Sequence, residues 1–560
     1  MIKRLFTPSV AAVVVSLVSL SVFLPAVRNG FVHWDDGTNV VANPYFRGFG
    51  WTQLRWMWTN HLMEHYVPLT WMSFGLDYTI WKQRSFGYHL TNILLHSVNA
   101  GLFFCLAVAL LKLARSPDSD RKRAPLIWGA AFAALFFSLH PLRVESVAWV
   151  TERRDVLSGC FYLLALLAYL RRFPTEQHRP VQAKYYWLCL ALFIASVLSK
   201  EITVTLPAAL LILDVYPLRR LASAPSQWFT PTARRVWIEK VPFLAVSVAD
   251  GIMTMNVAVK HHLPESIQAL GWIPRLTITV YGMAFYLLKT IAPLHLSALY
   301  PLTGYKTDAL AAPFWMSAAA VLAVTVAAVA LRRRFPGLLA VWVLYTITLL
   351  PVGGIIHNGT QITADRYSYL SCLGWALLAG VGMSAGWRVA SRWPALRMLL
   401  AGFAVLVCVV LGWRTRTQIH VWHDSETLWS SVVAVEPSAL ALNSLGAAYA
   451  DEGDSLGAIE LYHRAIAMDT GYGLAHNNLG LAYLDLNRLD DAMREFRIAQ
   501  QLMPNVAAAY NGSGNVLRLK GKLDEAIRDY QQALQLDPGN PGVRKNLDWA
   551  LALKASMPRR

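Results

Sequence analysis

Charged residues are scarce in this chain. Only 15% of its 560 residues are charged, whereas a soluble globular protein carries about 25%. The scarcity leaves apolar runs of about 20 residues along the first three-quarters of the sequence, which is the length of a membrane-spanning helix. The composition therefore excludes a large soluble protein and predicts an all-α polytopic membrane domain.

Cysteine is also rare, and its placement excludes two further classes of protein. The five cysteines all lie in apolar segments and none has CxxC spacing. They are interpreted as small buried hydrophobic residues, and they predict neither a disulfide framework nor a zinc site.

Acidic residues are few in the first part of the chain, and this explains the net charge of +17. Residues 1–419 hold 38 Lys+Arg and 17 Asp+Glu, whereas residues 420–560 hold 13 and 17. The excess of base lies in short loops between apolar runs, as the positive-inside rule predicts, and forms no basic patch on a folded domain. No nucleic-acid partner is expected.

The apolar runs predict eleven or twelve spans. The first run (9–27) is interpreted as an uncleaved first span, because no small-residue cleavage site precedes Arg28. Three apolar segments lie between basic loops 217–240 and 331–334, which are both expected on the cytoplasmic side. Three crossings cannot return the chain to the same side, so one of the three segments is expected not to cross, which would leave eleven spans. The loops expected to be cytoplasmic are 112–124, 171–183, 217–240, 331–334 and 388–397. The loops expected on the opposite face are 28–89, 141–155 and 353–366.

A repeat of 34 residues occupies the end of the chain. Gly446, Gly480 and Gly514 recur at this spacing, as do aromatic residues 16 positions after each. This is the tetratricopeptide (TPR) pattern, in which small residues lie where two helices touch. The predicted domains are a membrane domain (1–418) and a TPR domain (419–560). The latter has repeats at 439–472, 473–506 and 507–540, a preceding partial repeat, and a C-terminal capping helix.

The first outer loop contains adjacent acids, Asp35 and Asp36, just after the first span. One could accept a proton from an acceptor hydroxyl while the other orients the acceptor or holds a metal. A solvated turn explains the same DDG sequence equally well. His65 and Tyr66 follow in the same loop, before Pro68, where a break between loop and helix would direct them toward the acids.

Further charged residues gather on the predicted outer face. Glu145, Arg154 and Asp155 lie in the second outer loop, and Arg366 lies at the third. Lys200 follows a short span and could simply pair with Glu201. Internal ion pairs would explain these residues, and so would a phosphate site built from Arg154, Lys200 and Arg366. Few acids lie mid-span, which argues against a transporter.

Together these stretches resemble the transmembrane-and-TPR group of GT-C glycosyltransferases, related to eukaryotic O-mannosyltransferases. The matching stretches are FVHWDDGTNVVANP, YVPLTWMSFGLDY, FGYHLTNILLHSVN, HPLRVESVAWVTERRDVL, LSKEITVTLP and ADRYSYL. With the TPRs, the resemblance covers nearly the whole chain. It implies a GT-C-like membrane fold, a polyprenyl-phosphate-linked sugar as donor, and transfer to a protein or glycan hydroxyl.

The charge pattern and the resemblance together predict roles for individual residues, and the resemblance itself implies the role of the acidic pair. Asp35 and Asp36 would be catalytic. Arg154, Lys200 and Arg366 would bind the donor phosphate, and the acceptor or sugar pocket would contain His65, Tyr66, Glu145 and Asp155. A divalent metal, Mg²⁺ or Mn²⁺, would be held by Asp35, Asp36 and Asp155 if one is used.

The TPRs would recruit the acceptor or a partner protein through their groove. The setting expected is a bacterial inner membrane with periplasmic TPRs. The alternative is a non-catalytic scaffold that is anchored in the membrane and gathers envelope proteins through its TPRs.

Overall fold

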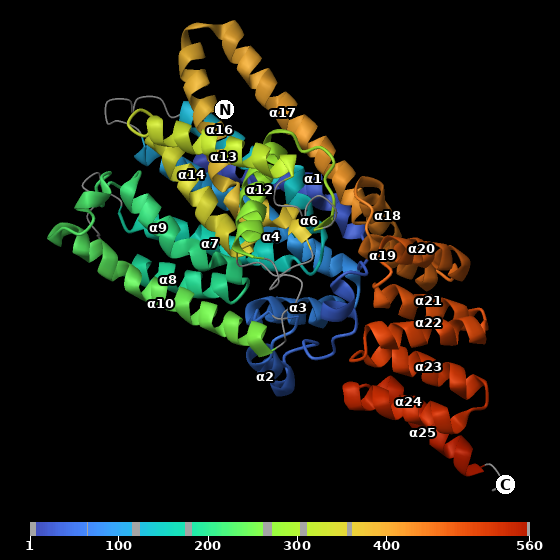
Figure 1. The fold of residues 1–560 in the computed structure, drawn as a ribbon. Helices are drawn as coiled ribbons and strands as arrows, with labels where there is room; N and C mark the ends of the chain where they lie inside the picture. Colours follow the sequence, from blue (N-terminus) through green and yellow to red (C-terminus); the bar gives the residue numbers. More distant parts are fainter. Residues whose placement is uncertain are drawn as a thin grey trace. The chain divides into compact units, whose positions relative to one another are not determined.

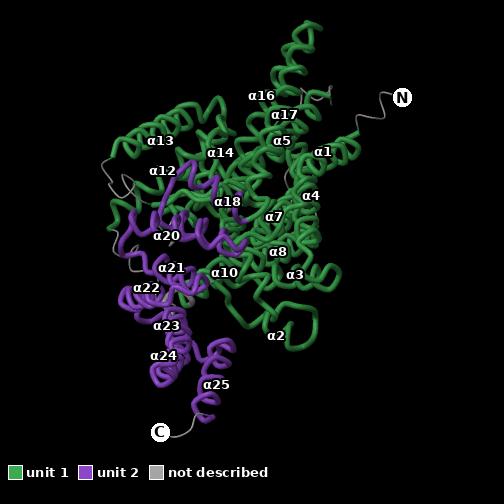
Figure 2. The backbone as a smooth tube through the Cα atoms, turned by 90° about the vertical axis from the view of Figure 1, so that its right-hand side faces the viewer, with its two compact units in different colours: residues 1–424 green, residues 425–560 purple. Residues whose placement is uncertain are grey.

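The computed structural model describes residues 7–63, 65–114, 124–173, 182–260, 271–302, 311–355 and 361–556. The chain divides into two compact units, Met1–Asp424 and Ser425–Arg560, which Figure 2 shows in green and purple. The boundary predicted at 418/419 falls inside the last long helix of the first unit, and the division comes just after that helix.

The first unit is a helical bundle, as the apolar runs predict. Its helices are α1 (Pro8–Phe23), α2 (Trp51–Thr59), α3 (Pro68–Trp81), α4 (Ser85–Leu113), α5 (Ala124–Ser138), α6 (Val144–Ala148), α7 (Arg153–Arg171), α8 (Ala183–Val197), α9 (Leu206–Val215), α10 (Pro231–Lys260), α12 (Trp272–Ile291), α13 (Ala312–Ala330), α14 (Pro336–Leu349), α15 (Ser368–Ser371), α16 (Leu373–Val389) and α17 (Pro394–Val421).

Four helices among the described residues are long and apolar enough to cross a membrane. They are Pro8–Arg28, α4, α13 and α17. Two bent helix pairs raise the number to six if each pair is one span: Ala124–Ser138 with Pro141–Ala148, and Asp365–Ser371 with Leu373–Arg392, both bent by 57°. These helices make the first unit an integral membrane domain, whereas the count of eleven or twelve spans stays a prediction.

A polar stripe on α4 holds the segments that carry the outer loops. His89, Asn92, His96 and Asn99 recur at helical spacing and are fully buried. The Asn92 amide donates to the carbonyls of Val147 and Trp149, both at 3.2 Å. Each buried amide or ring nitrogen must find a partner, so the stripe fixes the backbone between α6 and α7.

His96, on the same stripe, is a packing residue. Its Nδ1 shares a hydrogen bond of 2.9 Å with the Tyr369 hydroxyl, and its Nε2 lies 3.0 Å from the Ser138 carbonyl. The Asn99 amide donates to the same Tyr369 hydroxyl at 2.9 Å. The stripe therefore also fixes α15, which follows the third outer loop.

A short antiparallel pair of strands, which the sequence did not predict, holds the third outer loop. In it β1 (Tyr300–Pro301) pairs with β2 (Gln361–Thr363). The Tyr300 hydroxyl donates to Asp365 Oδ1 at 3.0 Å. These contacts place the η10 turn (Asp365–Tyr367) at the end of β2.

The second unit is a TPR solenoid of antiparallel helix pairs, coloured orange to red in Figure 1. A Cβ at Gly446, Gly480 or Gly514 would lie 2.6–2.8 Å from the aromatic ring of the next helix, so the helices of each pair touch where the repeat has glycine. Its helices are α18 (Ser425–Val435), α19 (Ala439–Asp451), α20 (Ser455–Met468), α21 (Gly473–Asp485), α22 (Leu489–Leu502), α23 (Ala507–Leu519), α24 (Leu523–Leu536) and α25 (Pro541–Ser556).

The cysteines are free thiols, as expected, but they are not uniformly buried. Cys189 and Cys372 are buried, Cys160 and Cys408 are partly exposed, and Cys105 is exposed. The helix of Cys105 is a membrane-span candidate, so this thiol lies on an apolar helix face.

Candidate active site

Asp36 anchors the first outer loop to the second. Its Oδ1 accepts hydrogen bonds from the Thr151 amide at 2.9 Å and the Thr151 hydroxyl at 2.6 Å, and its Oδ2 accepts from the Val32 amide at 3.2 Å. The side chain is 1% exposed, and burial raises its pKa to about 6. Both carboxylate oxygens are thus occupied by neighbours in the protein.

We expect Asp36→Ala to destabilise the first unit by about 1–3 kcal/mol, because it leaves buried donors on Val32 and Thr151 without an acceptor. The melting temperature of the purified protein measures this. Thr151→Val is the matched control, since it removes the hydroxyl alone and should lower the melting temperature less. An equal or smaller loss in Asp36→Ala would contradict the anchoring role.

The carboxylate of Asp35, which precedes Asp36 in the chain, is not engaged in this way. Within the part of the chain that the structure describes, no hydrogen bond or ion pair involves its carboxylate, and the side chain is partly exposed. Burial raises the pKa of Asp35, and the positive charges of Arg154 and Arg366 partly offset that rise. A carboxylate of raised pKa that lies within electrostatic reach of two guanidinium groups has the properties of a general base beside an anion site.

Glu152, between α6 and α7, is the centre of a buried group of ion-paired side chains, which we call the charged cluster. Its members are Glu145, Glu152, Arg154, Asp155, Lys200 and Arg366. Glu152 Oε1 accepts from Arg154 Nη2 at 2.6 Å and lies 3.5 Å from Arg366 Nε. Its Oε2 accepts from Lys200 Nζ at 2.7 Å. Glu152 is 1% exposed. Burial alone would raise its pKa, but the three cations outweigh burial and hold the pKa of Glu152 well below its usual range.

Two further acids complete the cluster. Asp155 accepts from Lys200 at 2.8 Å and from the Ser146 hydroxyl at 2.9 Å. Glu145 accepts from the Arg366 amide at 2.8 Å and also pairs with the Arg366 side chain. Burial lowers the pKa of Lys200, but its two carboxylate partners more than reverse this. Three acids and three bases therefore balance in charge.

Two adjacent arginines of α7 have different surroundings. Arg153 is saturated: it donates to Asn92 at 2.6 Å, to Asp77 at 2.5 Å and to the Tyr88 carbonyl at 2.7 Å. Arg154 donates to Glu152, but its buried Nε has no partner among the described residues. Arg153 therefore holds α3 and α4 against α7, whereas Arg154 keeps an unused donor close to Asp35.

His65 and Tyr66 lie at the edge of the cluster, where both contact Glu201. His65 Nδ1 is 3.3 Å from Glu201 Oε1, which also accepts from the Tyr66 amide at 3.2 Å. The Tyr66 hydroxyl donates to the Trp58 carbonyl at 2.9 Å. Glu201 therefore pairs with His65, whereas Lys200 pairs with Glu152 and Asp155, so Lys200 and Glu201 do not pair with each other. His65 lies close enough to lower the pKa of Asp35, although less than the arginines do.

A row of indole rings next to Asp35 was not predicted from the sequence. Trp34 packs on Trp149 with ring centroids 5.1 Å apart, and Trp149 stacks on Trp422 at 5.5 Å. The Arg366 guanidinium lies over Trp149 at 5.5 Å. Trp422, interpreted from the sequence as part of a TPR-like segment, instead ends α17 in the first unit. In the sequence Trp149 lies between two apolar residues, so only its contacts in the folded structure show that it belongs to the candidate site.

The predicted site residues thus fall into three groups. The first is the connected cluster of Glu145, Arg154, Asp155, Lys200 and Arg366, joined through Glu152. The second is Asp35, which interacts electrostatically with Arg154 and Arg366 of the cluster. The third is Asp36, His65 and Tyr66, which bind other parts of the protein. Among the described residues, no three His, Cys, Asp or Glu side chains form a metal-binding group.

Comparison with known proteins gives matches over both units. The tetratricopeptide-repeat family matches residues 443–507 and 507–540. Protein O-mannosyl-transferase Tmtc1 of Drosophila melanogaster is 26% identical over 528 residues, which cover 78% of this chain and 59% of the fly protein. Human TMTC1 is 24% identical, over 77% of this chain and 52% of its own length.

This chain is a homologue of the transmembrane-and-TPR protein O-mannosyl-transferases. It spans little more than half the length of these two relatives. Xenopus laevis tmtc2 is 34% identical over a shorter stretch, 28% of this chain and 17% of the frog protein. A solved structure, the first TPR domain of human RPAP3, is 28% identical, covers 21% of this chain and 97% of its own, and has a TM-score of 0.21.

Proposed function

We propose that this protein is a membrane glycosyltransferase that moves a sugar from a polyprenyl-phosphate donor to a hydroxyl of a protein or glycan acceptor. The observation that carries the proposal is the Asp35 carboxylate, which has no hydrogen-bond or ion-pair partner among the described residues and lies within electrostatic reach of Arg154 and Arg366. Homology to protein O-mannosyl-transferases supports the reaction class and makes mannose the first sugar to test.

The proposed transfer is a single displacement. The acceptor oxygen attacks the anomeric carbon as the bond between that carbon and the phosphate oxygen breaks, and the electron pair of this bond leaves with the polyprenyl phosphate. Asp35 takes the proton of the attacking hydroxyl. Attack opposite the leaving group inverts the anomeric centre. The raised pKa of Asp35 makes it a stronger base than a solvated carboxylate.

The leaving phosphate gains negative charge as the bond breaks. In the proposed mechanism, cations that the fold already holds in place stabilise this charge. Arg154 offers the unpartnered Nε described above, and Arg366 is held over Trp149. Lys200, which is held by two carboxylates, contributes a third positive charge. Glu145 and Asp155 would then hold these cations and would not themselves touch the sugar.

The proposed steps use the side chains of this chain alone. The acids expected to bind Mg²⁺ or Mn²⁺ do not form a ligand group in the described part of the chain. Asp36 and Asp155 direct their carboxylate oxygens at protein donors. In the described part of the chain, Asp36 and Asp155 are therefore occupied by protein donors, and a bound divalent ion stays a prediction.

Arg154→Gln tests the phosphate assignment. We expect kcat/KM for the lipid-linked donor to fall roughly ten- to 100-fold, the range for losing a charge-assisted hydrogen bond. Glu152 keeps Lys200 and Arg366, so the melting temperature should fall less than it would on removal of the Glu152 charge itself. Arg154→Lys should retain part of the activity, because it keeps the charge. A lower melting temperature with unchanged kcat/KM would show that Arg154 is purely structural.

We place the site on the extracytoplasmic face of a bacterial inner membrane, with periplasmic TPRs that recruit the acceptor or a partner protein. The positive loops of the first unit support this sidedness. TPR solenoids form extended concave surfaces suited to binding polypeptides.

A further inference from the structure

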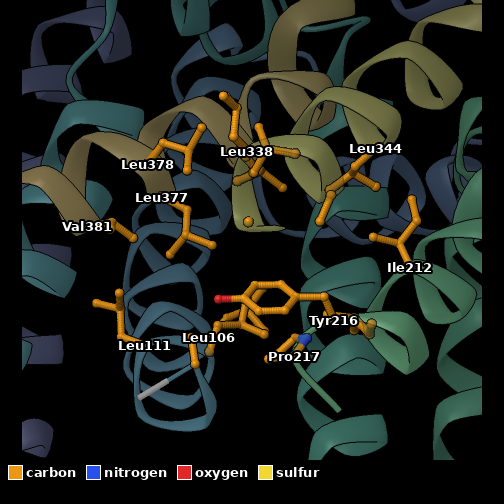
Figure 3. Close-up of a pocket in the computed structure, with 18 of the residues that line it drawn as sticks. Leu106, Leu111, Ile212, Tyr216, Pro217, Leu338, Leu344, Leu377, Leu378 and Val381 are labelled. Atoms are coloured by element: carbon orange, nitrogen blue, oxygen red, sulfur yellow. The ribbon is translucent and has the colours of Figure 1, made fainter. Parts of the chain in front are cut away.

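The first unit contains an apolar cavity that none of the charged-cluster residues lines. Its volume is about 570 Å³, and its walls come from α4, α7, α9, α14 and α16. Figure 3 shows leucine, isoleucine and valine side chains from these helices around the space, with the Tyr216 ring among them. Walls of this kind fit hydrocarbon chains and offer little to a polar ligand.

Two charged residues line the cavity, Arg334 and Arg388. Arg334 lies just before α14 begins, and Arg388 lies in the last turn of α16. Both side chains are exposed, and neither guanidinium has a hydrogen bond or ion pair within the described ranges. The Arg334 guanidinium lies over the neighbouring Phe335 ring, at 5.5 Å. Two cations that line one apolar cavity, neither of them in an ion pair among the described residues, complement an anionic head group on an apolar tail.

The part of the cavity at Arg388 is distant from the candidate active site. Arg366 precedes α16, whereas Arg388 stands in the last turn of that 17-residue helix, which is roughly 25 Å long at 1.5 Å per residue. One phosphate cannot contact both arginines. The basic loops at 331–334 and 388–397 put the cavity arginines at the predicted cytoplasmic surface, opposite the charged cluster.

We propose that this cavity binds an anionic glycerophospholipid from the cytoplasmic leaflet, with its phosphate against Arg334 and Arg388 and its acyl chains along α14 and α16. Guanidinium groups suit this role because they bind phosphate oxygens in a bidentate manner. Tyr216 packs against Gly337, where an added Cβ would lie 3.4 Å from the ring. Its hydroxyl gives the apolar wall a polar group that can bind lipid ester oxygens.

Lipid binding to the purified full-length protein tests the proposal without an activity assay. Dioleoyl-phosphatidylglycerol and dioleoyl-phosphatidylcholine are titrated separately, with bound lipid counted by native mass spectrometry and the melting temperature followed in parallel. We expect the wild-type protein to retain phosphatidylglycerol preferentially. Arg334→Gln/Arg388→Gln should weaken its binding roughly tenfold or more. Leu377→Trp, which fills the cavity, should also release the lipid.

The matched control is Arg333→Gln/Arg392→Gln, which removes two exposed charges nearby that do not line the cavity. It should bind phosphatidylglycerol as the wild type does. The proposal is overturned if the control loses as much affinity as the cavity variant, or if wild-type protein binds both lipids equally. Displacement of phosphatidylglycerol by an equal concentration of polyprenyl phosphate would also overturn it, since the cavity would then belong to the donor.

Discussion

Asp35→Asn should lower sugar transfer by roughly 10²–10⁴-fold, the contribution of a general base, while leaving the melting temperature unchanged. The asparagine has the same size, and no hydrogen bond of Asp35 within the described residues is lost. Donor binding should persist, so the loss should appear in kcat. The measurement is the rate of transfer by purified protein in proteoliposomes.

The pH dependence gives an internal check on that variant. Asp35 must be ionised to accept a proton, so wild-type activity should fall as the pH drops through its pKa, which burial places above 3.8. The remaining activity of Asp35→Asn should lack this acid limb. Asp424→Asn is the matched control, because it makes the same chemical change at a partly exposed acid outside the cluster. Wild-type rates in Asp35→Asn would eliminate Asp35 as the base.

The largest loss of stability is expected from Glu152→Gln, about 3–5 kcal/mol, the usual cost of breaking a buried ion pair. The variant removes one buried negative charge shared by Arg154, Lys200 and Arg366. The three cations would then face only Glu145 and Asp155 as partners within the cluster. A strongly lowered melting temperature is the readout.

A double-mutant cycle identifies the cause. Lys200→Met removes one of the cations that Glu152 balances, so Glu152→Gln/Lys200→Met should lose less stability than the sum of the two single variants. Strict additivity would contradict a shared charge balance. Glu426→Gln, at an acid in the first turn of α18 in the second unit, serves as the control and should melt like the wild type.

The sequence predicted those parts of the fold that repeat or depend on composition. Gly480 and its equivalents recur every 34 residues because each faces the ring of a following helix, so spacing alone locates the repeat. Long apolar runs likewise mark α4 and α17 as spans. Shorter helices such as α8 gain burial from neighbours, and composition does not say whether they cross.

Most charged residues of the candidate site were named from the sequence, but Glu152 at the centre of the cluster and the pairs between these residues were not predicted. Glu145 and Arg366 lie 221 positions apart, and their contact depends on β1, β2 and α4 placing two outer loops together. Asp35 and Asp36 are indistinguishable in sequence, and only the position of Thr151 decides which one is occupied. No local pattern carries that information.

The most direct measurement of the proposed function is transfer of labelled mannose by the purified wild-type protein, compared for two donors. One donor is polyprenyl-phosphate-mannose in the bilayer, and the other is a soluble nucleotide-linked mannose. With the lipid donor, labelled acceptor and free polyprenyl phosphate should appear in equal amounts, and both should be lost in Asp35→Asn. Product formed from the nucleotide donor alone, or unchanged in Asp35→Asn, would contradict the proposed function.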